Sequence, residues 1–157
     1  MIISIGQKET KNFAKNFAKS VFDSVYDTHH TVLVISLEGD LGTGKTTFAQ
    51  GFAEGLGIKE KIQSPTFVIL KIYKIGVKAK ESWSRKQLIH VDAYRLHFKD
   101  FKVFGWEDFV KNPENIILVE WGNKIKKILP KDTIRILFKH NTKTSRKIVI
   151  VNNAPKK

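Results

Sequence analysis

The stretch VLVISLEGDLGTGKTT, residues 32–47, decides the fold of this chain. Residues 32–37 form an apolar, partly β-branched run that is typical of a buried strand. Residues 39–46 match Gly-x-x-x-x-Gly-Lys-[Ser/Thr], the loop that wraps the phosphates of a nucleotide. Apolar residues then recur at helical spacing from Phe48 to Leu56. A strand, this loop and a helix in this order predict a phosphate-binding loop and argue against an accidental glycine turn.

Each residue type in the loop has a chemical reason to be there. Glycines let the backbone turn sharply and aim its N–H groups inward, so that phosphates meet donors at the positive end of the next helix. The Lys45 ammonium would reach the β and γ phosphates, and the Thr46 hydroxyl would hold Mg²⁺. The predicted nucleotide-binding residues of this segment are Gly39, Asp40, Leu41, Gly42, Thr43, Gly44, Lys45, Thr46 and Thr47.

Two later apolar runs end in carboxylates. Asp92 follows residues 88–91, and Glu120 follows residues 116–119. In phosphate-loop enzymes, carboxylates at the carboxyl ends of strands near the loop manage Mg²⁺ and the attacking water. We therefore predict that both acids belong to the site, and either could be the primary Mg²⁺ ligand. The alternative is that one of them is an ordinary surface or capping acid.

Length and composition fit one domain over residues 1–157. The absence of cysteine excludes disulfides, thiolate catalysis and cysteine-rich metal sites. The first residues contain no apolar stretch of signal-peptide length, and no other run has the length of a membrane span. We expect a soluble, cytoplasmic protein that does not bind a membrane.

The remaining pattern alternates helices and strands. It predicts an α/β fold of the P-loop NTPase type, with a mainly parallel central sheet, helices on both faces and antiparallel edge strands. We expect residues 76–86 to form a mobile loop and the last few residues to be flexible. The predicted elements are a helix from Thr10, its cap, to Asp27; strands over 67–73, 87–92 and 116–120; a short helix over 105–110; and an antiparallel pair at a sheet edge over 133–139 and 147–151.

The net charge of +13 is concentrated in two segments. Residues 121–157 carry eleven Lys and Arg against Asp132, and residues 71–87 carry six against Glu81. Such basic segments attract polyanions, RNA above all, or an acidic partner surface. A generally lysine-rich composition explains the same counts, since 24 of the 28 cations are lysine. Both interpretations stay open.

Four segments together carry a family resemblance. They are GDLGTGKTTF at 39–48, SPTF at 64–67, HVDAYRL at 90–96 and EW at 120–121. In this order and spacing, they resemble the bacterial TsaE (YjeE) family, small ATPases required for making threonylcarbamoyladenosine in transfer RNA. The match extends over roughly residues 10–130.

The resemblance assigns roles to particular residues. It implies that Lys45 and the loop bind ATP, that Thr46 and Glu120 hold Mg²⁺, and that Asp92 supports the metal or orients water. Thr66 resembles a switch residue that senses the γ-phosphate, and Thr10 resembles a position near the adenine, although its predicted helix-cap role explains it equally well. The roles of His90, Tyr94, Arg95 and Trp121 are left open.

The resemblance predicts an Mg²⁺-dependent ATPase that serves as a nucleotide switch for TsaB and TsaD partners in threonylcarbamoyl modification of transfer RNA. It would not itself transfer the threonylcarbamoyl group. The basic segments 71–87 and 124–157 are candidates for contact with transfer RNA. One alternative is an RNA-binding module in which the nucleotide is structural. A small-molecule kinase is another, but its lid needs several clustered arginines, and the four of this chain are scattered.

Overall fold

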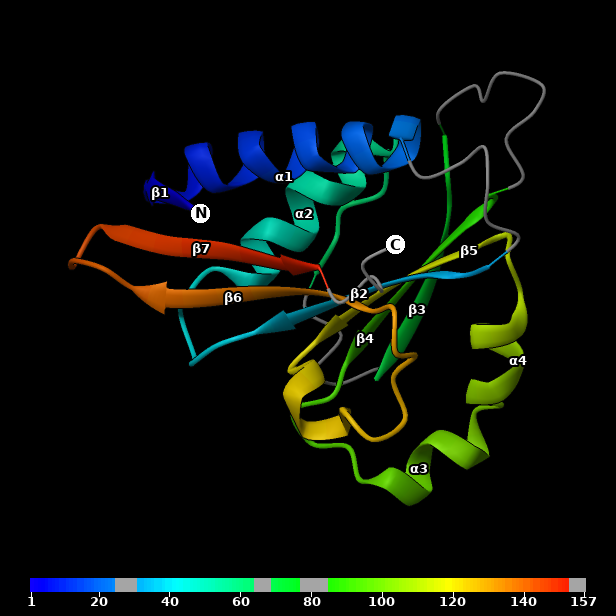
Figure 1. Ribbon diagram of the computed structural model, residues 1–157. Helices are drawn as coiled ribbons and strands as arrows, with labels where there is room; N and C mark the ends of the chain where they lie inside the picture. Colours follow the sequence, from blue (N-terminus) through cyan, green and yellow to red (C-terminus); the bar gives the residue numbers. More distant parts are fainter. Residues whose placement is uncertain (25–30, 64–68, 77–84, 153–157) are drawn as a thin grey trace.

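The computed structural model describes residues 1–24, 31–63, 69–76 and 85–152. Strands and helices alternate along most of this part of the chain (Figure 1). The elements are β1 (Ile2–Ile5), α1 (Gly6–Ser24), β2 (Leu33–Glu38), α2 (Lys45–Gly55), β3 (Leu70–Lys74), β4 (Gln87–Asp92), α3 (Phe98–Val103), α4 (Trp106–Lys111), β5 (Asn115–Glu120), the 3₁₀ helix η1 (Gly122–Ile125), β6 (Ile134–His140) and β7 (Ser145–Asn152).

Within the described residues, seven strands form one sheet in the order β1-β7-β6-β2-β5-β4-β3. The four central strands, β6, β2, β5 and β4, run parallel to one another. The pairs β1–β7, β7–β6 and β4–β3 are antiparallel. The predicted α/β class, with a parallel centre and antiparallel strands outside it, is confirmed.

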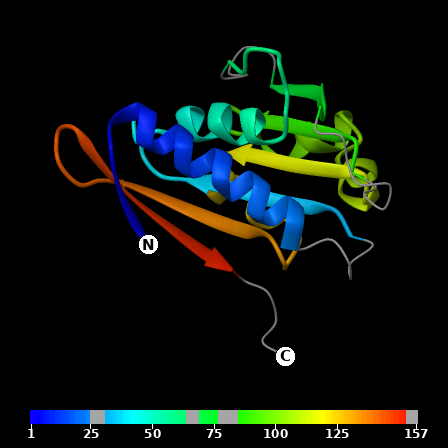
Figure 2. The same cartoon turned by 90° about the horizontal axis from the view of Figure 1, so that it is seen from above.

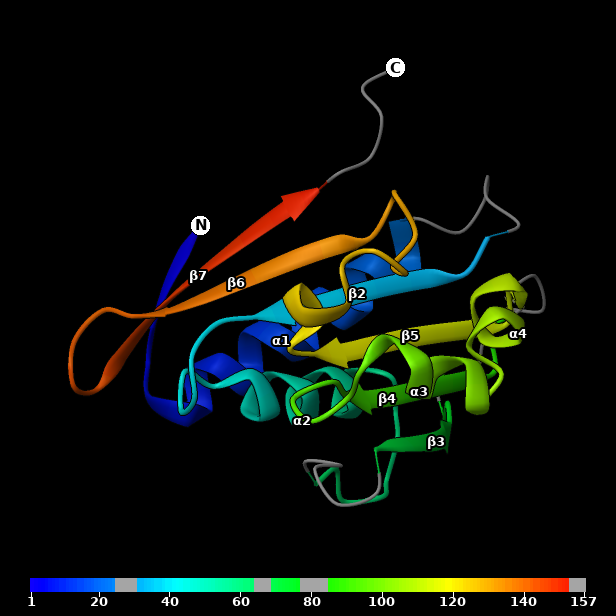
Figure 3. The same cartoon turned by 90° about the horizontal axis from the view of Figure 1, so that it is seen from below.

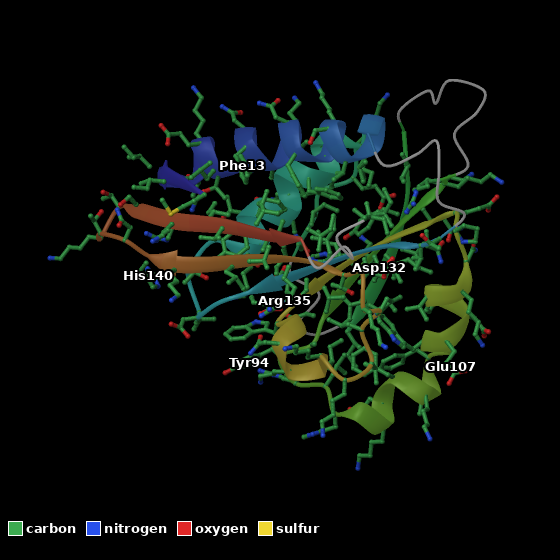
Figure 4. All side chains as sticks on the ribbon, viewed as in Figure 1. Phe13, Tyr94, Glu107, Asp132, Arg135 and His140 are labelled. Atoms are coloured by element: carbon green, nitrogen blue, oxygen red, sulfur yellow. The ribbon has the colours of Figure 1, made fainter. Side chains whose placement is uncertain are left out.

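Helices cover both faces of the sheet, as predicted. Helices α1 and α2 lie across one face (Figures 1 and 2). The shorter α3, α4 and η1 lie on the other (Figure 3). Phe13 on α1 and Glu107 on α4 mark these opposite sides in Figure 4. Because alternate side chains of a strand point to opposite faces, Ile35 of β2 packs under α1 and α2, whereas Val34 packs on the other side.

Close packing of α1 on α2 depends on glycine. A Cβ atom added to Gly51 would lie 2.3 Å from the carbonyl oxygen of Lys11, and one added to Gly55 would lie 2.6 Å from that of Lys15. No real Cβ tolerates such a distance to backbone. These glycines therefore let the two helix backbones approach, with Ala14 and Ala18 of α1 fully buried at the contact. This packing fixes α2, whose first residue is Lys45.

Four features of the fold differ from the prediction. Helix α1 begins at Gly6 and not at Thr10, because β1 ends at Ile5 and the Gly6 N–H donates to the Thr144 carbonyl. Strand β1 itself was missed: four residues are too few for a clear pattern. The β6–β7 pair is not at the sheet edge, because β1 pairs with β7. Helix α3 was also missed.

Other predictions are confirmed or concern residues that the structure does not describe. Strands β4 and β5 and helix α4 lie within a residue of their predicted bounds, and β3 covers the later part of its predicted range. The mobile loop predicted over 76–86 and the flexible terminus fall largely at 77–84 and 153–157, outside the described residues. Within those residues, the chain contains no helix with the length and apolar character of a membrane span.

Candidate nucleotide-binding site

The predicted phosphate loop connects the end of β2 to the start of α2. Gly44 precedes α2 with φ of 101°, a left-handed conformation that glycine adopts without strain. The loop is held by its own bonds, since the Thr43 hydroxyl donates to the Asp40 carbonyl at 2.7 Å. The first turn of α2 points its free N–H groups toward the loop, so this end of the helix favours anions.

The side chain of Lys45, the first residue of α2, reaches back onto the loop and is almost fully buried. Its Nζ donates to the carbonyl oxygens of Gly39 at 2.8 Å and Asp40 at 2.7 Å, and it lies 3.8 Å from the centre of the Trp121 ring. Burial lowers the pKa of Lys45, and the negative charge of Glu120 is the largest influence that opposes this shift. A buried cation enclosed by loop carbonyls and a π-face is well placed to receive an anion.

The two predicted acids meet beside the loop. Asp92 and Glu120 are register partners at the ends of β4 and β5, and both are buried. In Figure 3 the arrowheads of β2, β5 and β4 point in the same direction, so the carboxyl ends of these strands lie on one side of the sheet. Glu120 Oε2 accepts a hydrogen bond of 2.9 Å from the Thr46 hydroxyl, across 74 positions of sequence. Asp92 Oδ1 accepts from the Tyr94 N–H at 2.9 Å. The predicted convergence of Thr46 with these carboxylates is therefore found in the fold.

These residues line one cleft of about 330 Å³. A larger groove, about 620 Å³, lies beside α3 and α4, but the loop and both acids line the smaller cleft. The sequence reasoning missed Gln7, which no pattern connects to a loop more than thirty positions away. The cleft is lined by Gln7, Leu41, Gly42, Gly44, Lys45, Thr46, Thr47, Asp92, Tyr94, Glu120 and Trp121.

Thr10 lies beside the loop but does not cap α1. It is buried inside the helix, where its hydroxyl hydrogen-bonds to the Ser4 hydroxyl at 2.7 Å and to the Gly6 carbonyl at 3.3 Å. It lines a small cavity of about 100 Å³ that shares Gln7, Gly42, Gly44 and Thr47 with the main cleft. The cap prediction was wrong, and the expected place of Thr10 near the adenine stays a prediction. Thr66 lies outside the described residues.

Tyr94 and Trp121, whose roles the sequence left open, line the same cleft as the loop. Tyr94 and Trp121 contact each other with ring centres 4.9 Å apart. The Lys124 ammonium lies 4.3 Å from the Tyr94 ring centre. Tyr94 lies on the α3 side of the molecule in Figure 4. Trp121 has φ of 61°, which is uncommon for a residue other than glycine. This turn directs the Trp121 ring back over Lys45.

Several residues of the two basic segments have partners within the protein. Arg85 is buried and donates to the carbonyls of Thr31 and Asn115. Arg135 binds the Glu38 carboxylate through two hydrogen bonds. The segments also lie toward opposite ends of the sheet, one on β3 and β4 and the other from η1 to β7. The described parts therefore do not form one continuous basic strip along the sheet.

Comparison with known proteins identifies the family of this chain. The family model described as threonylcarbamoyl adenosine biosynthesis protein TsaE matches residues 5–148. The chain belongs to the TsaE family. The TsaE protein of Bacillus subtilis is 40% identical over 115 residues, which are 73% of this chain and 66% of that protein. The TsaE protein of Treponema pallidum is 36% identical over 118 residues, covering 74% of this chain and 80% of that one.

A solved TsaE-like fold supports the same assignment. The crystal structure of YdiB from Bacillus subtilis superposes with a TM-score of 0.69 at 32% sequence identity. The match covers 98% of this chain and 84% of the YdiB chain. The family prediction and the predicted fold class are thus both confirmed.

Proposed function

We propose that this TsaE protein is an Mg²⁺-dependent ATPase that acts as an accessory nucleotide switch in threonylcarbamoyladenosine biosynthesis on transfer RNA. The observation that carries the proposal is the Thr46–Glu120 hydrogen bond of 2.9 Å beside the buried Lys45. It joins the first turn of α2 to the end of β5, where a triphosphate on the loop would place its terminal phosphates. The names of the relatives supply the pathway.

Phosphate binding follows from the contacts of Lys45. Its ammonium now donates to two carbonyls of the loop, at Gly39 and Asp40. An entering triphosphate offers stronger, charge-assisted acceptors, so the ammonium would exchange at least one carbonyl for a phosphate oxygen. The N–H groups at the start of α2 complete the anion site.

The oxygen atoms beside the loop fit Mg²⁺. This ion prefers hard oxygen ligands and is bound by one or two carboxylates together with substrate phosphates. Thr46 and Glu120 would hold it, with Asp92 nearby at the paired strand position. Among the described residues, no group of three His, Cys, Asp or Glu could hold a metal without such phosphates. When bound, Mg²⁺ would neutralise charge on the phosphate oxygens.

The residues of this chain would act mainly by positioning and charge. Lys45 would stabilise the charge that develops on the phosphates, and the α2 N-terminus would add to that stabilisation. Asp92 would orient the attacking water from the end of β4. The Tyr94 N–H donates to Asp92 Oδ1 and so helps to hold this carboxylate in place at the end of β4.

Switching and partners belong to the same proposal. ATP binding would order the segment that contains Thr66 and dock the protein on TsaB and TsaD partners, and hydrolysis would release it. Transfer RNA contact would come from the basic segments 71–87 and 124–157, where Lys74, Lys126 and Lys143 are exposed among the described residues. The chain spans 66% of the length of the Bacillus subtilis relative. We therefore propose the partners of this chain from its family membership.

Phosphate release by purified protein, with and without Mg²⁺, tests the proposal. Lys45→Ala and Glu120→Ala should each abolish hydrolysis, whereas the exposed Lys127→Ala serves as the matched control and should retain it. Co-purification with TsaB and TsaD in ATP, in ADP and without nucleotide tests the switch. Unchanged hydrolysis in both site variants, or equal association in all three nucleotide states, would contradict it.

A further inference from the structure

His90 is a fully buried polar side chain in the middle of the sheet. It lies on β4, two residues before Asp92, with no exposed surface. On the same face of β4 and its neighbour β5, Leu88 and Leu118 belong to the apolar core. An apolar residue would be the simplest choice at such a position, because burying a polar ring costs free energy unless it is hydrogen-bonded. The hydrogen bond that His90 makes therefore indicates why it is there.

That hydrogen bond goes to Glu120. His90 Nε2 lies 3.0 Å from Glu120 Oε1, and both side chains are closed to solvent. A carboxylate only accepts hydrogen bonds, so the proton of this pair is on Nε2 and the ring donates. The other ring nitrogen, Nδ1, has no hydrogen-bond partner among the described residues. Within this part of the chain, the polar function of His90 is directed entirely at Glu120.

The two oxygens of Glu120 consequently have different partners. Oε1 accepts from His90 at 3.0 Å, and Oε2 accepts from the Thr46 hydroxyl at 2.9 Å. Donors on opposite oxygens hold the carboxylate plane in one orientation. The Oε2 side faces the first turn of α2 and the cleft, whereas the Oε1 side faces the core beneath it.

We propose that His90 is a positioning residue that fixes the Glu120 carboxylate, so that Oε2 and the Thr46 hydroxyl together face the metal of a bound Mg²⁺–nucleotide. The inference rests on the proposed function and adds to it a second layer of contacts around the metal. Outer partners that orient a ligating carboxylate contribute strongly to metal affinity. A purely structural histidine would instead affect folding and leave metal binding unchanged.

Replacement of His90 separates these two roles. His90→Leu keeps the volume and removes the donor, whereas His90→Gln keeps an N–H group that can reach Glu120. Val91→Ala is the matched control, because Val91 is equally buried on the same strand but faces the opposite core. For each protein, the affinity for a non-hydrolysable ATP analogue is measured by calorimetry in saturating Mg²⁺ and in chelator. Thermal unfolding is followed in parallel.

The ratio of the affinity in Mg²⁺ to the affinity in chelator measures how much the metal contributes to nucleotide binding. We expect His90→Leu to lower this ratio about 10- to 100-fold, with little change in chelator. His90→Gln should recover most of it, and Val91→Ala should lose thermal stability without a change in the ratio. An unchanged ratio in His90→Leu, or no recovery in a folded His90→Gln, overturns the role of His90.

Two further results keep the test decisive. If His90→Leu does not fold, ¹⁵N–¹H spectra of wild-type protein still report which ring nitrogen of His90 carries the proton, and a proton on Nδ1 alone overturns the proposal. If wild-type protein gains no affinity from Mg²⁺, the proposed Mg²⁺ dependence fails together with the role of His90. If wild-type protein gains affinity and His90→Leu gains as much, only the role of His90 fails.

Discussion

The ion pair between Glu38 and Arg135, at the end of β2 just before the phosphate loop, should be costly to break from the Arg135 side. Glu38 ends β2, and Arg135 lies on the neighbouring β6. Arg135 Nε donates to Oε1 at 2.8 Å and Nη2 donates to Oε2 at 2.6 Å, while the Ser36 hydroxyl donates to Oε1 at 2.9 Å. The Glu38 side chain is 8% exposed and that of Arg135 is 26% exposed. Removal of Arg135 leaves the poorly solvated Glu38 carboxylate without its cation.

The expected loss for Arg135→Met is about 2–4 kcal/mol in the free energy of unfolding. Breaking a buried pair by removing one partner costs about 3–5 kcal/mol. The partial exposure of Arg135 and the remaining bond from Ser36 reduce that figure. Glu38→Gln should cost less than Arg135→Met, because it leaves Arg135 able to reach water. The double variant should lose less than the sum of the two single losses, by at least about 0.5 kcal/mol.

Urea unfolding monitored by circular dichroism measures these differences. Glu114→Gln is the matched control, since it breaks the Glu114–Lys86 pair, whose side chains are 40% and 66% exposed. Surface pairs of this kind contribute at most about 1 kcal/mol. If Arg135→Met cost no more than Glu114→Gln, or if the single losses simply added, the reasoning about burial would be refuted.

The same pair predicts a dependence on pH. Burial raises the pKa of Glu38, but the hydrogen bonds from Arg135 and Ser36 and the charges of Arg135 and Lys126 outweigh burial and hold it below its ordinary value. Its contribution is therefore complete above the carboxyl pKa of the unfolded chain and is lost as pH falls through the lower, folded value. Glu38→Gln should flatten the acid limb of a stability-against-pH curve measured by urea unfolding. An acid limb as steep as that of the wild type would contradict this.

Two other predictions concern the helix packing and the site. Gly51→Ala should destabilise the protein by about 1–3 kcal/mol in urea unfolding, because its Cβ would lie 2.3 Å from the Lys11 carbonyl oxygen. An unchanged free energy of unfolding would contradict the close approach of α1 and α2. Trp121→Phe should remove most of the change in tryptophan fluorescence on nucleotide binding. The Lys45 ammonium lies 3.8 Å from the centre of the Trp121 ring, so a nucleotide that moves Lys45 changes the surroundings of this ring. A fluorescence change as large as that of the wild type would contradict this.

The site was predictable from sequence where its residues are local or follow a strand. The phosphate loop is one continuous segment, so its pattern carries both the conformation and the chemistry. Asp92 and Glu120 were found because each ends an apolar run, and parallel strands bring such ends together. The cap assigned to Thr10 failed because a strand of four residues, β1, displaces the start of the helix and carries too little pattern to be seen.

Other parts of the site depend on register and on close approach between distant segments. His90 has the same alternation as its neighbours, and only the pairing of β4 with β5 brings its ring to Glu120. Gln7 enters the cleft because α1 packs on α2, and Arg135 reaches Glu38 because β6 lies beside β2. None of these pairs is close in sequence, so no local pattern connects them.

The sequence by itself determined a phosphate loop between strand and helix, an α/β sheet, and the two acids that end β4 and β5. These features are set by local patterning, since backbone conformation and strand ends depend on neighbouring residues. Only the tertiary structure decided which oxygen of Glu120 meets Thr46 and which meets His90. Such contacts depend on strand register and helix packing to within an ångström, because hydrogen bonds weaken steeply beyond their short range.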